Sequence, residues 1–141
     1  MKIRKIEATP VEEERRMAFL LRHIGPRWVS FEQLLNQWMK RLSCHYSGDY
    51  WDYFELSNGG FYLTPSATKK TFLMTSTNFA RENVSADAAG IIVTMFALTE
   101  LMGIMDCKGD GGLDNIIERY YALRDFAIEH REREKIFSII Y

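Results

Sequence analysis

Three carboxylates in an aromatic-rich stretch, residues 46–65, are the first groups in this chain whose types and spacing suggest chemistry. Asp49, Asp52 and Glu55 lie close enough in sequence for acid–base catalysis or metal binding. In a regular strand, however, Asp49 and Glu55 face one side and Asp52 faces the other. No partner acid lies at a spacing diagnostic of a glycosidase. We therefore expect these acids to solubilise an aromatic strand, and a hydrolase remains the less favoured alternative.

The cysteine and histidine residues give weaker support to catalysis. Cys44 and His45 are adjacent, and neighbouring side chains seldom face each other as a nucleophile and its base must. His23 and His130 fall near the ends of expected helices, where an imidazole can bond to free carbonyl groups. The chain has 2 Cys and 3 His, widely scattered, whereas zinc needs three or four grouped ligands. The sequence thus shows no convincing catalytic centre, and it predicts no metal site.

The charge balance bears on nucleic acid as a partner. The formal net charge is −1, whereas phosphate binding usually requires a basic surplus and imitation of DNA requires a large acidic one. Arg15, Arg16, Arg22 and Arg27 still allow a local basic patch. A nucleic-acid-binding module is therefore kept as the alternative function, with nucleic acid unlikely as the main partner.

The elements that position these groups begin with a β-hairpin. Residues 50–56 and 61–64 are short, aromatic-rich segments typical of strands. Between them Ser57-Asn58-Gly59-Gly60 accepts positive φ and turns the chain. Residues 70–75 have the composition of a third strand. Together these segments predict a three-stranded antiparallel meander.

Helices are expected before and after this meander along the chain. Thr9-Pro10-Val11-Glu12 has the composition of a helix start, and that helix should run to about His23. Ser30 is the expected cap of a second helix that ends near Cys44. Residues 113–129 form an amphipathic helix, and residues 131–141 a short helix or strand. The predicted core faces are Phe31, Leu34, Leu35, Trp38, Met39 and Leu42 in the second helix and Ile116, Ile117, Tyr120, Leu123, Ala127 and Ile128 in the later one.

The longest apolar run covers residues 85–105 and is capped by Ser85 or Asp87. Its apolar residues surround the helix on nearly all sides, which predicts a buried central helix. A membrane span is the alternative, but Glu100 would cost several kcal/mol in hydrocarbon, so no membrane is expected. The N-terminus lacks the apolar segment of a secretory signal, which favours the cytoplasm. We predict one α+β domain, residues 1–141, with a small three-stranded antiparallel meander packed on four to five helices.

Four segments, in order along the chain, resemble one protein family. The most specific is residues 46–65, Tyr-Ser-Gly-Asp-Tyr-Trp-Asp-Tyr-Phe-Glu-Leu-Ser-Asn-Gly-Gly-Phe-Tyr-Leu-Thr-Pro. Residues 15–25, 85–91 and 121–127 match further motifs of the same family. On these segments the chain resembles the ArdB/KlcA antirestriction proteins, which plasmids, phages and genomic islands carry.

The resemblance implies an α+β protein without catalytic centre or cofactor that relieves type I restriction of incoming DNA. The implied partner is the type I restriction enzyme or a factor controlling it. The implied mechanism differs from acidic DNA mimicry, and we expect a monomer or weak oligomer.

Several residues of the chain suit such a contact by their physical properties. Tyr50, Trp51 and Tyr53 are strand aromatics, and exposed Trp and Tyr are enriched where proteins bind one another. Asn58 and Gly59 shape the turn. Asp125 lies beside an apolar helix face, where an ion pair with an arginine is the favoured structural role. The candidate interaction residues are thus Tyr50, Trp51, Tyr53, Asn58, Gly59 and Asp125.

Overall fold

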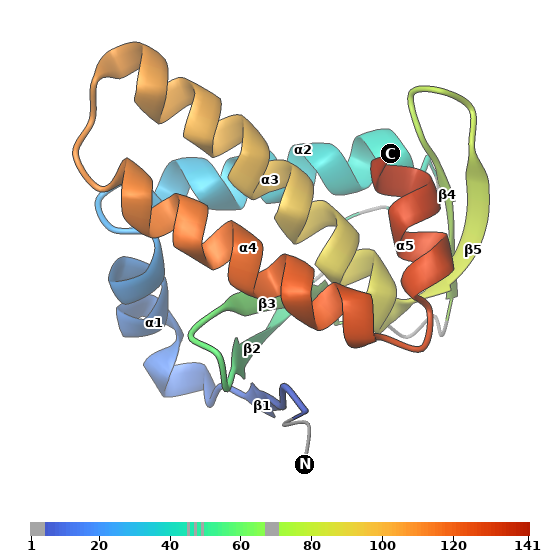
Figure 1. Ribbon diagram of the computed structural model, residues 1–141, viewed down its shortest axis with the longest axis horizontal. Helices are drawn as coiled ribbons and strands as arrows, with labels where there is room; N and C mark the ends of the chain where they lie inside the picture. The colour runs from blue at the N-terminus through green and yellow to red at the C-terminus, as the bar shows by residue number, and fades with distance from the viewer. Residues whose placement is uncertain (1–4, 45, 47, 49, 67–70) are drawn as a thin grey trace.

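The computed structural model describes residues 5–44, 46, 48, 50–66 and 71–141, which form five α-helices, one 3-10 helix and five strands (Figure 1). In chain order they are β1 (Ala8–Pro10), η1 (Glu13–Arg15), α1 (Arg16–His23), α2 (Trp28–Leu42), β2 (Trp51–Leu56), β3 (Phe61–Pro65), β4 (Thr71–Thr75), β5 (Arg81–Ser85), α3 (Ala86–Lys108), α4 (Leu113–Glu129) and α5 (Arg133–Ile140). The α+β class is confirmed.

Helix α3 is the centre of the fold and packs against α2, α4, α5 and strand β3 (Figure 1). Its predicted start is confirmed, because Ser85 Oγ accepts a hydrogen bond from the Ala88 amide at 3.1 Å. By length and composition α3 could cross a membrane, but 67% of its most apolar window is buried inside the fold. The neighbouring elements thus account for its apolar surface, as predicted for a central helix.

The closest approach of α3 to the sheet lies at Gly90. A Cβ atom built there would stand 2.3 Å from the Leu63 carbonyl oxygen and 2.7 Å from Thr64 Cα. Both are backbone atoms that a side chain cannot push aside. Strand β3 is buried along its whole length beneath this contact.

The strand pairing differs from the predicted meander in its third member. Residues 71–75 do form a strand, but β4 pairs with β5 in a separate two-stranded sheet. The first sheet has the order β1-β2-β3, with Ala8 opposite Leu56. Pro10 suits this edge position because it has no amide to donate. Lys70, the expected first residue of the third strand, lies outside the described residues.

Two predicted helix starts were wrong, although the other helix predictions hold. Residues 9–12 are extended, and α1 begins at Arg16 after the 3-10 turn. Helix α2 begins at Trp28, so Ser30 lies inside it. The early start of α2 is due to Gly25, whose φ of 86° turns the chain just after α1 and brings its carbonyl to the Trp28 amide. The end of α1 at His23 is confirmed, as are the bounds of α4, and the last segment is helix α5.

The predicted core of α2 is confirmed, with Trp38 half-buried and stacked on Phe96. In α4 the buried residues are Ile116, Leu123 and Ala127, which recur at helical spacing on one stripe. Ile128 was predicted in the core, but it is 43% exposed because it follows Ala127 by one position and turns away from that stripe.

Candidate functional site

The predicted interaction residues on β2 lie where that strand meets α1 and α2, around Arg16. The Arg16 guanidinium donates to the Trp51 carbonyl at 3.0 Å and to Asp52 Oδ1 at 3.3 Å. It also stands 5.0 Å from the ring centroid of Tyr53, a cation–π geometry. Asp52 Oδ2 accepts from Ser66 Oγ at 2.9 Å. Asp52 therefore neutralises an arginine and is satisfied at both oxygens.

Helix α2 holds the other side of this cluster. The Trp51 indole donates to Asn36 Oδ1 at 3.2 Å, and the Tyr53 hydroxyl donates to Glu32 Oε2 at 3.3 Å. Burial, followed by the charge of Glu32, raises the pKa of Tyr53 to about 12. Tyr53 therefore stays protonated at neutral pH and acts as a hydrogen-bond donor. We call the group formed by Arg16, Glu32, Asn36, Trp51, Asp52 and Tyr53 the Arg16 cluster.

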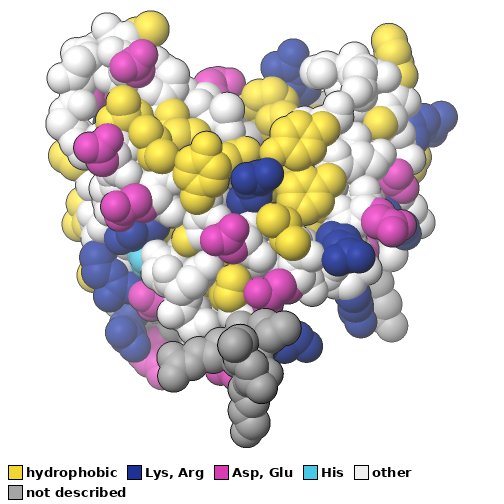
Figure 2. Space-filling model, viewed as in Figure 1, with side chains coloured by type: hydrophobic (Ala, Val, Ile, Leu, Met, Phe, Trp, Pro, Cys, Tyr) yellow, Lys and Arg dark blue, Asp and Glu magenta, His cyan; other side chains and the backbone are white. Residues whose placement is uncertain are grey.

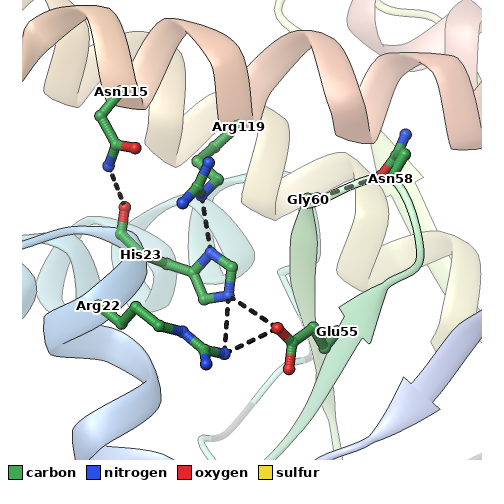
Figure 3. Close-up of polar contacts among 7 residues, drawn as sticks. All are labelled: Arg22, His23, Glu55, Asn58, Gly60, Asn115 and Arg119. Atoms are coloured by element: carbon green, nitrogen blue, oxygen red, sulfur yellow. Dashed lines mark hydrogen bonds and ion pairs between the residues drawn. The ribbon is translucent and has the colours of Figure 1, made fainter.

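A second polar group surrounds the buried imidazole of His23 (Figure 3). Arg119 Nε of α4 donates to His23 Nδ1 at 2.8 Å, which places the ring proton on Nε2. His23 Nε2 faces Glu55 Oε1 at 3.7 Å, and Arg22 pairs with the same carboxylate at 2.7 Å. Burial, followed by the charges of Arg119 and Arg22, lowers the pKa of His23 to about 4. The imidazole is thus neutral at pH 7, and its contact with Glu55 is not an ion pair.

The geometry around His23 argues against a general base. Its one basic nitrogen already accepts from Arg119, and the ring lies between Phe19 and Phe61 at centroid distances of 4.5 and 4.9 Å. A general base needs a free lone pair within reach of the substrate proton. The imidazole instead joins α1, the β2–β3 hairpin and α4. The predicted bond from this ring to free helix carbonyls was wrong.

A third polar group, not predicted from the sequence, lies at the start of α3. Tyr62 and His130 both bond to Asp87, at 2.7 and 2.8 Å. Ser85 Oγ contacts Glu132, whose own amide donates to His130 Nδ1 at 3.0 Å. Serine, histidine and aspartate are the residue types of a hydrolytic triad. Here the serine bonds to Glu132 and both histidine nitrogens are occupied, so the group ties α3 to the segment between α4 and α5.

The carboxylate chemistry of the hydrolase alternative is not assembled in the described part of the chain. Asp52 is paired with Arg16 and Glu55 with Arg22, while Asp49 lies outside the described residues. Among the described residues no group of three or more His, Cys, Asp or Glu side chains could hold a metal ion. The groove next to Glu55, between β1 and α1, has a volume of about 310 Å³ and is lined by Thr9, Pro10, Val11, Glu14, Arg15, Ala18, Phe19, Arg22 and Glu55.

The proposed basic patch is largely neutralised by ion pairs. Arg16 pairs with Asp52, Arg22 with Glu55, and Arg27 with Asp110. Each paired carboxylate cancels the charge that a phosphate would seek. Of the four arginines, Arg15 alone makes no ion pair among the described residues, and it is exposed. The structure thus weakens the case for nucleic acid at this face.

The six candidate interaction residues occupy different environments. Tyr50 is 83% exposed, Trp51 is half-buried in the Arg16 cluster, and Tyr53 is 8% exposed and belongs to the core. Asp125 is exposed, and the expected ion pair with an arginine does not form among the described residues. The strand aromatics therefore include one strongly exposed ring, Tyr50.

Asn58 and Gly59 form a latch between the hairpin turn and α4. Asn58 Nδ2 donates to the Ala122 carbonyl at 2.8 Å, and Asn58 Oδ1 accepts from the Gly60 amide at 3.1 Å (Figure 3). Gly59 has φ of 91°, a conformation that favours glycine. These two residues therefore position the hairpin against α4, one helical turn before Asp125.

Comparison with known proteins places this architecture in one family. Residues 44–141 match the family model described as antirestriction protein. The chain is 40% identical over 136 residues to antirestriction protein KlcA of Escherichia coli, covering 96% of this chain and 94% of that protein. It is also 33% identical over 140 residues to the uncharacterized protein YfjX of Escherichia coli K12, covering 96% and 88% of the two chains.

A solved structure extends the similarity to the whole fold. The structure, from work on the KlcA and ArdB proteins, superposes with a TM-score of 0.87 at 37% identity and covers 100% of both chains. Those proteins are described as having a novel fold and antirestriction activity against type I DNA restriction systems in vivo but not in vitro. From the family model, the KlcA relatives and this structural match, the chain belongs to the antirestriction protein family.

Proposed function

We propose that this protein relieves type I restriction of incoming DNA inside the cell, without catalysis, by contacting the type I restriction enzyme or a factor that controls it. The observation that carries the proposal is the match, along the full length of both chains, to the structure from the KlcA and ArdB work. Activity of those proteins in vivo but not in vitro favours a target that includes a cellular factor.

The polar groups of the chain support the non-catalytic part of the proposal. The basic nitrogen of His23 accepts a hydrogen bond from Arg119, and Asp52 and Glu55 each form an ion pair with an arginine. Ser85 and His130 are likewise engaged in bonds within the protein. Activation of a substrate would require breaking these bonds, whereas binding a partner would not.

The exposed side of the Arg16 cluster is the proposed contact site. Tyr50 presents a ring that is 83% exposed beside the half-buried indole of Trp51. Arg16 and Asn36 fix the Trp51 backbone and indole, and the Tyr50 carbonyl accepts from the Ser66 amide at 2.7 Å, so the backbone that carries both aromatic residues is held in a defined place. Rigid aromatic groups contribute much of the binding energy at protein interfaces.

Plating of unmodified phage on a type I restricting host tests the proposal. Expression of the wild-type protein should raise plating toward that on a non-restricting host, and Tyr50→Ser should reduce this relief. Leu73→Ser, which removes an exposed apolar side chain from β4, serves as the matched control and should retain relief. Wild-type protein that leaves plating unchanged would show the proposal to be wrong.

The nucleic-acid alternative is tested separately by mobility shift at low salt. Single- and double-stranded probes should remain unshifted, because the arginines around α1 are mostly paired. A shift that Arg15→Ala abolishes would favour the alternative function.

A further inference from the structure

A second set of aromatic residues lies on the β4–β5 turn, on α4 and at the C-terminal end of the chain, away in sequence from Tyr50. It consists of Phe79, Tyr120, Tyr121, Phe137 and Tyr141, which we call the aromatic surface. Phe79 is 84% exposed, Tyr141 66% and Tyr121 52%. Figure 2 shows hydrophobic side chains gathered over this face and at the end of the β4–β5 hairpin.

Two ring pairs and one backbone contact connect the elements that carry these residues. Tyr120 and Tyr121 lie 5.3 Å apart by ring centroid, and Phe137 stacks on Tyr141 at 5.8 Å. A side-chain hydrogen bond between Tyr120 and Tyr141 links the two ring pairs. Burial, followed by this bond, raises the pKa of Tyr120. Asn78 Nδ2 donates to the Tyr141 carbonyl at 3.1 Å, which ties the hairpin tip to the same surface.

The hairpin holds Phe79 in a costly conformation. Its φ is 69°, and it is the one positive-φ residue other than glycine in the described part of the chain. The turn around it is closed by bonds from the Phe79 amide to the Ser76 carbonyl and from the Ala80 amide to Ser76 Oγ, both at 3.0 Å. A bulky residue in this region is an outlier that the surroundings must stabilise. The phenyl ring is therefore presented to solvent by an ordered turn.

The charges on this surface define the partner's chemistry. Arg124 follows Tyr120 by one helical turn, and its Nε is buried with no hydrogen-bond partner. Arg81 is exposed two residues after Phe79. Among the described residues neither guanidinium makes an ion pair within 4 Å, and Figure 2 shows a basic side chain amid the hydrophobic group. A carboxylate brought by a partner would find an unpaired cation here.

The same face argues for protein over nucleic acid. Glu118 and Asp125 lie three and four residues from Tyr121, so all three share the exposed side of α4. A phosphate backbone carries negative charge alone and would meet these carboxylates. A protein can place a carboxylate opposite Arg124 and keep acids away from Asp125.

We infer that the aromatic surface binds a protein segment that presents apolar side chains flanked by carboxylates. The occupant inserts its apolar side chains among Phe79, Tyr121 and Tyr141 and sets a carboxylate on Arg124. Tyr and Arg are the residue types that dominate the energetics of such interfaces. This inference goes beyond the proposed function, since it concerns a separate surface and the chemistry of what binds there.

A pair of synthetic amphipathic helical peptides tests it, both with the same Leu and Phe face and with either Glu or Lys at the polar positions. Fluorescence anisotropy should give at least about tenfold tighter binding for the Glu peptide. Phe79→Ser and Arg124→Glu should each reduce its affinity by a similar factor, and Arg124→Glu should improve binding of the Lys peptide. Met17→Ser, at an exposed apolar position on α1, is the control and should bind as the wild type does.

The possible outcomes are separable from those of the restriction assay. Equal binding of both peptides, binding unaffected by Phe79→Ser, or binding of neither peptide overturns the inference. Preferential binding of a single-stranded oligonucleotide that Phe79→Ser abolishes overturns it in favour of nucleic acid. Because the readout is peptide affinity, a failure to relieve restriction leaves this result interpretable. Unfolding curves of each variant check that loss of affinity is not loss of fold.

Discussion

The two β-hairpins of this protein use their aromatic residues in opposite ways. In the β2–β3 hairpin, strand β3 is buried along its length and the turn is bonded to α4 through Asn58. In the β4–β5 hairpin, β4 alternates between exposed and buried residues, and the turn exposes Phe79. Figure 1 shows the first hairpin beneath the helices and the second extending beside α5.

The difference shows that the surrounding layers, rather than aromatic content, decide whether a ring is structural. Phe61 on β3 is enclosed by Phe19 and Phe31 at centroid distances of 5.6 and 5.7 Å. Among the described residues Phe79 makes no ring–ring contact, and it is 84% exposed. The first hairpin is thus part of the core, and the second is available for binding.

The largest loss of stability is expected from a methyl group at Gly90, where α3 packs on strand β3 of the first hairpin. Because the new Cβ would meet the backbone of Leu63 and Thr64, Gly90→Ala should lower the free energy of unfolding by about 4 kcal/mol or more. Gly103→Ala is the control in the same helix, since no atom lies within 4 Å of its Cβ. That variant should gain up to about 1 kcal/mol in urea unfolding. Similar curves for both variants would contradict the close packing of α3 on β3.

The contrast between the two hairpins is measured directly by paired Phe→Ala substitutions. Phe61→Ala should cost about 3–5 kcal/mol because it empties a buried site. Phe79→Ala should change stability by about 0.5 kcal/mol or less, as expected for a surface position. Chemical denaturation of both variants gives the comparison. A large loss from Phe79→Ala would mean that this ring is a core residue.

Acid should lower the folding stability of the protein through His23, which packs against the β2–β3 hairpin. The unfolded imidazole gains a proton below about pH 6.5, whereas the folded one remains neutral down to about 4. Folding stability is therefore complete above the unfolded pKa and falls as the pH decreases between these values. The slope should approach about 1.4 kcal/mol per pH unit within that window, which amounts to about 2–3 kcal/mol by pH 4.5.

His23→Phe supplies the reference for that titration. Urea unfolding of both proteins from pH 7.5 to 4.5 should show a difference in stability that shrinks with acidity by the amount above. Parallel pH profiles would mean that His23 is protonated in the folded protein as readily as in the unfolded one.

The smallest expected effect concerns the latch between the turn and α4. Asn58→Ala removes the bonds to Ala122 and Gly60 and should cost about 1–2 kcal/mol. Asn58→Asp keeps the acceptor for the Gly60 amide but sets a carboxylate oxygen against the Ala122 carbonyl, so its cost should be at least as large. Thermal unfolding of both variants and of the wild type measures these costs. Equal stability of wild type and Asn58→Ala would mean that the latch does not stabilise the fold.

Much of the fold follows from local sequence pattern. The apolar run that becomes α3 and the alternating face of α2 are set by residues close together in the chain, and both were predicted. The pairing of β4 was not, because the choice between β3 and β5 as its neighbour depends on contacts formed by the whole fold. The same limit explains β1, where three extended residues gain order by bonding to β2, as in the bond from the Val11 amide to the Tyr53 carbonyl at 2.8 Å.

The candidate site was predictable in part for the same reason. Aromatic content drew attention to Tyr50, Trp51 and Tyr53, yet their burial depends on α1 and α2, which sequence spacing does not reveal. The cluster around His23 joins α1 to residues 92 and 96 positions away on α4. Phe79 had no pattern signal, since its importance rests on a positive φ and on contact between the hairpin and the last helix.

The central claim, that this protein acts by contact rather than catalysis, is tested most directly by plating unmodified phage on a type I restricting host that expresses Glu55→Gln or Tyr50→Ser. Glu55→Gln removes a carboxylate whose ion pair with Arg22 is partly exposed, so its cost in stability should be below about 1 kcal/mol. If the protein acts by contact, Glu55→Gln should relieve restriction as the wild type does, and Tyr50→Ser should do so less. Loss of relief in a folded Glu55→Gln protein, with full relief by Tyr50→Ser, would contradict it.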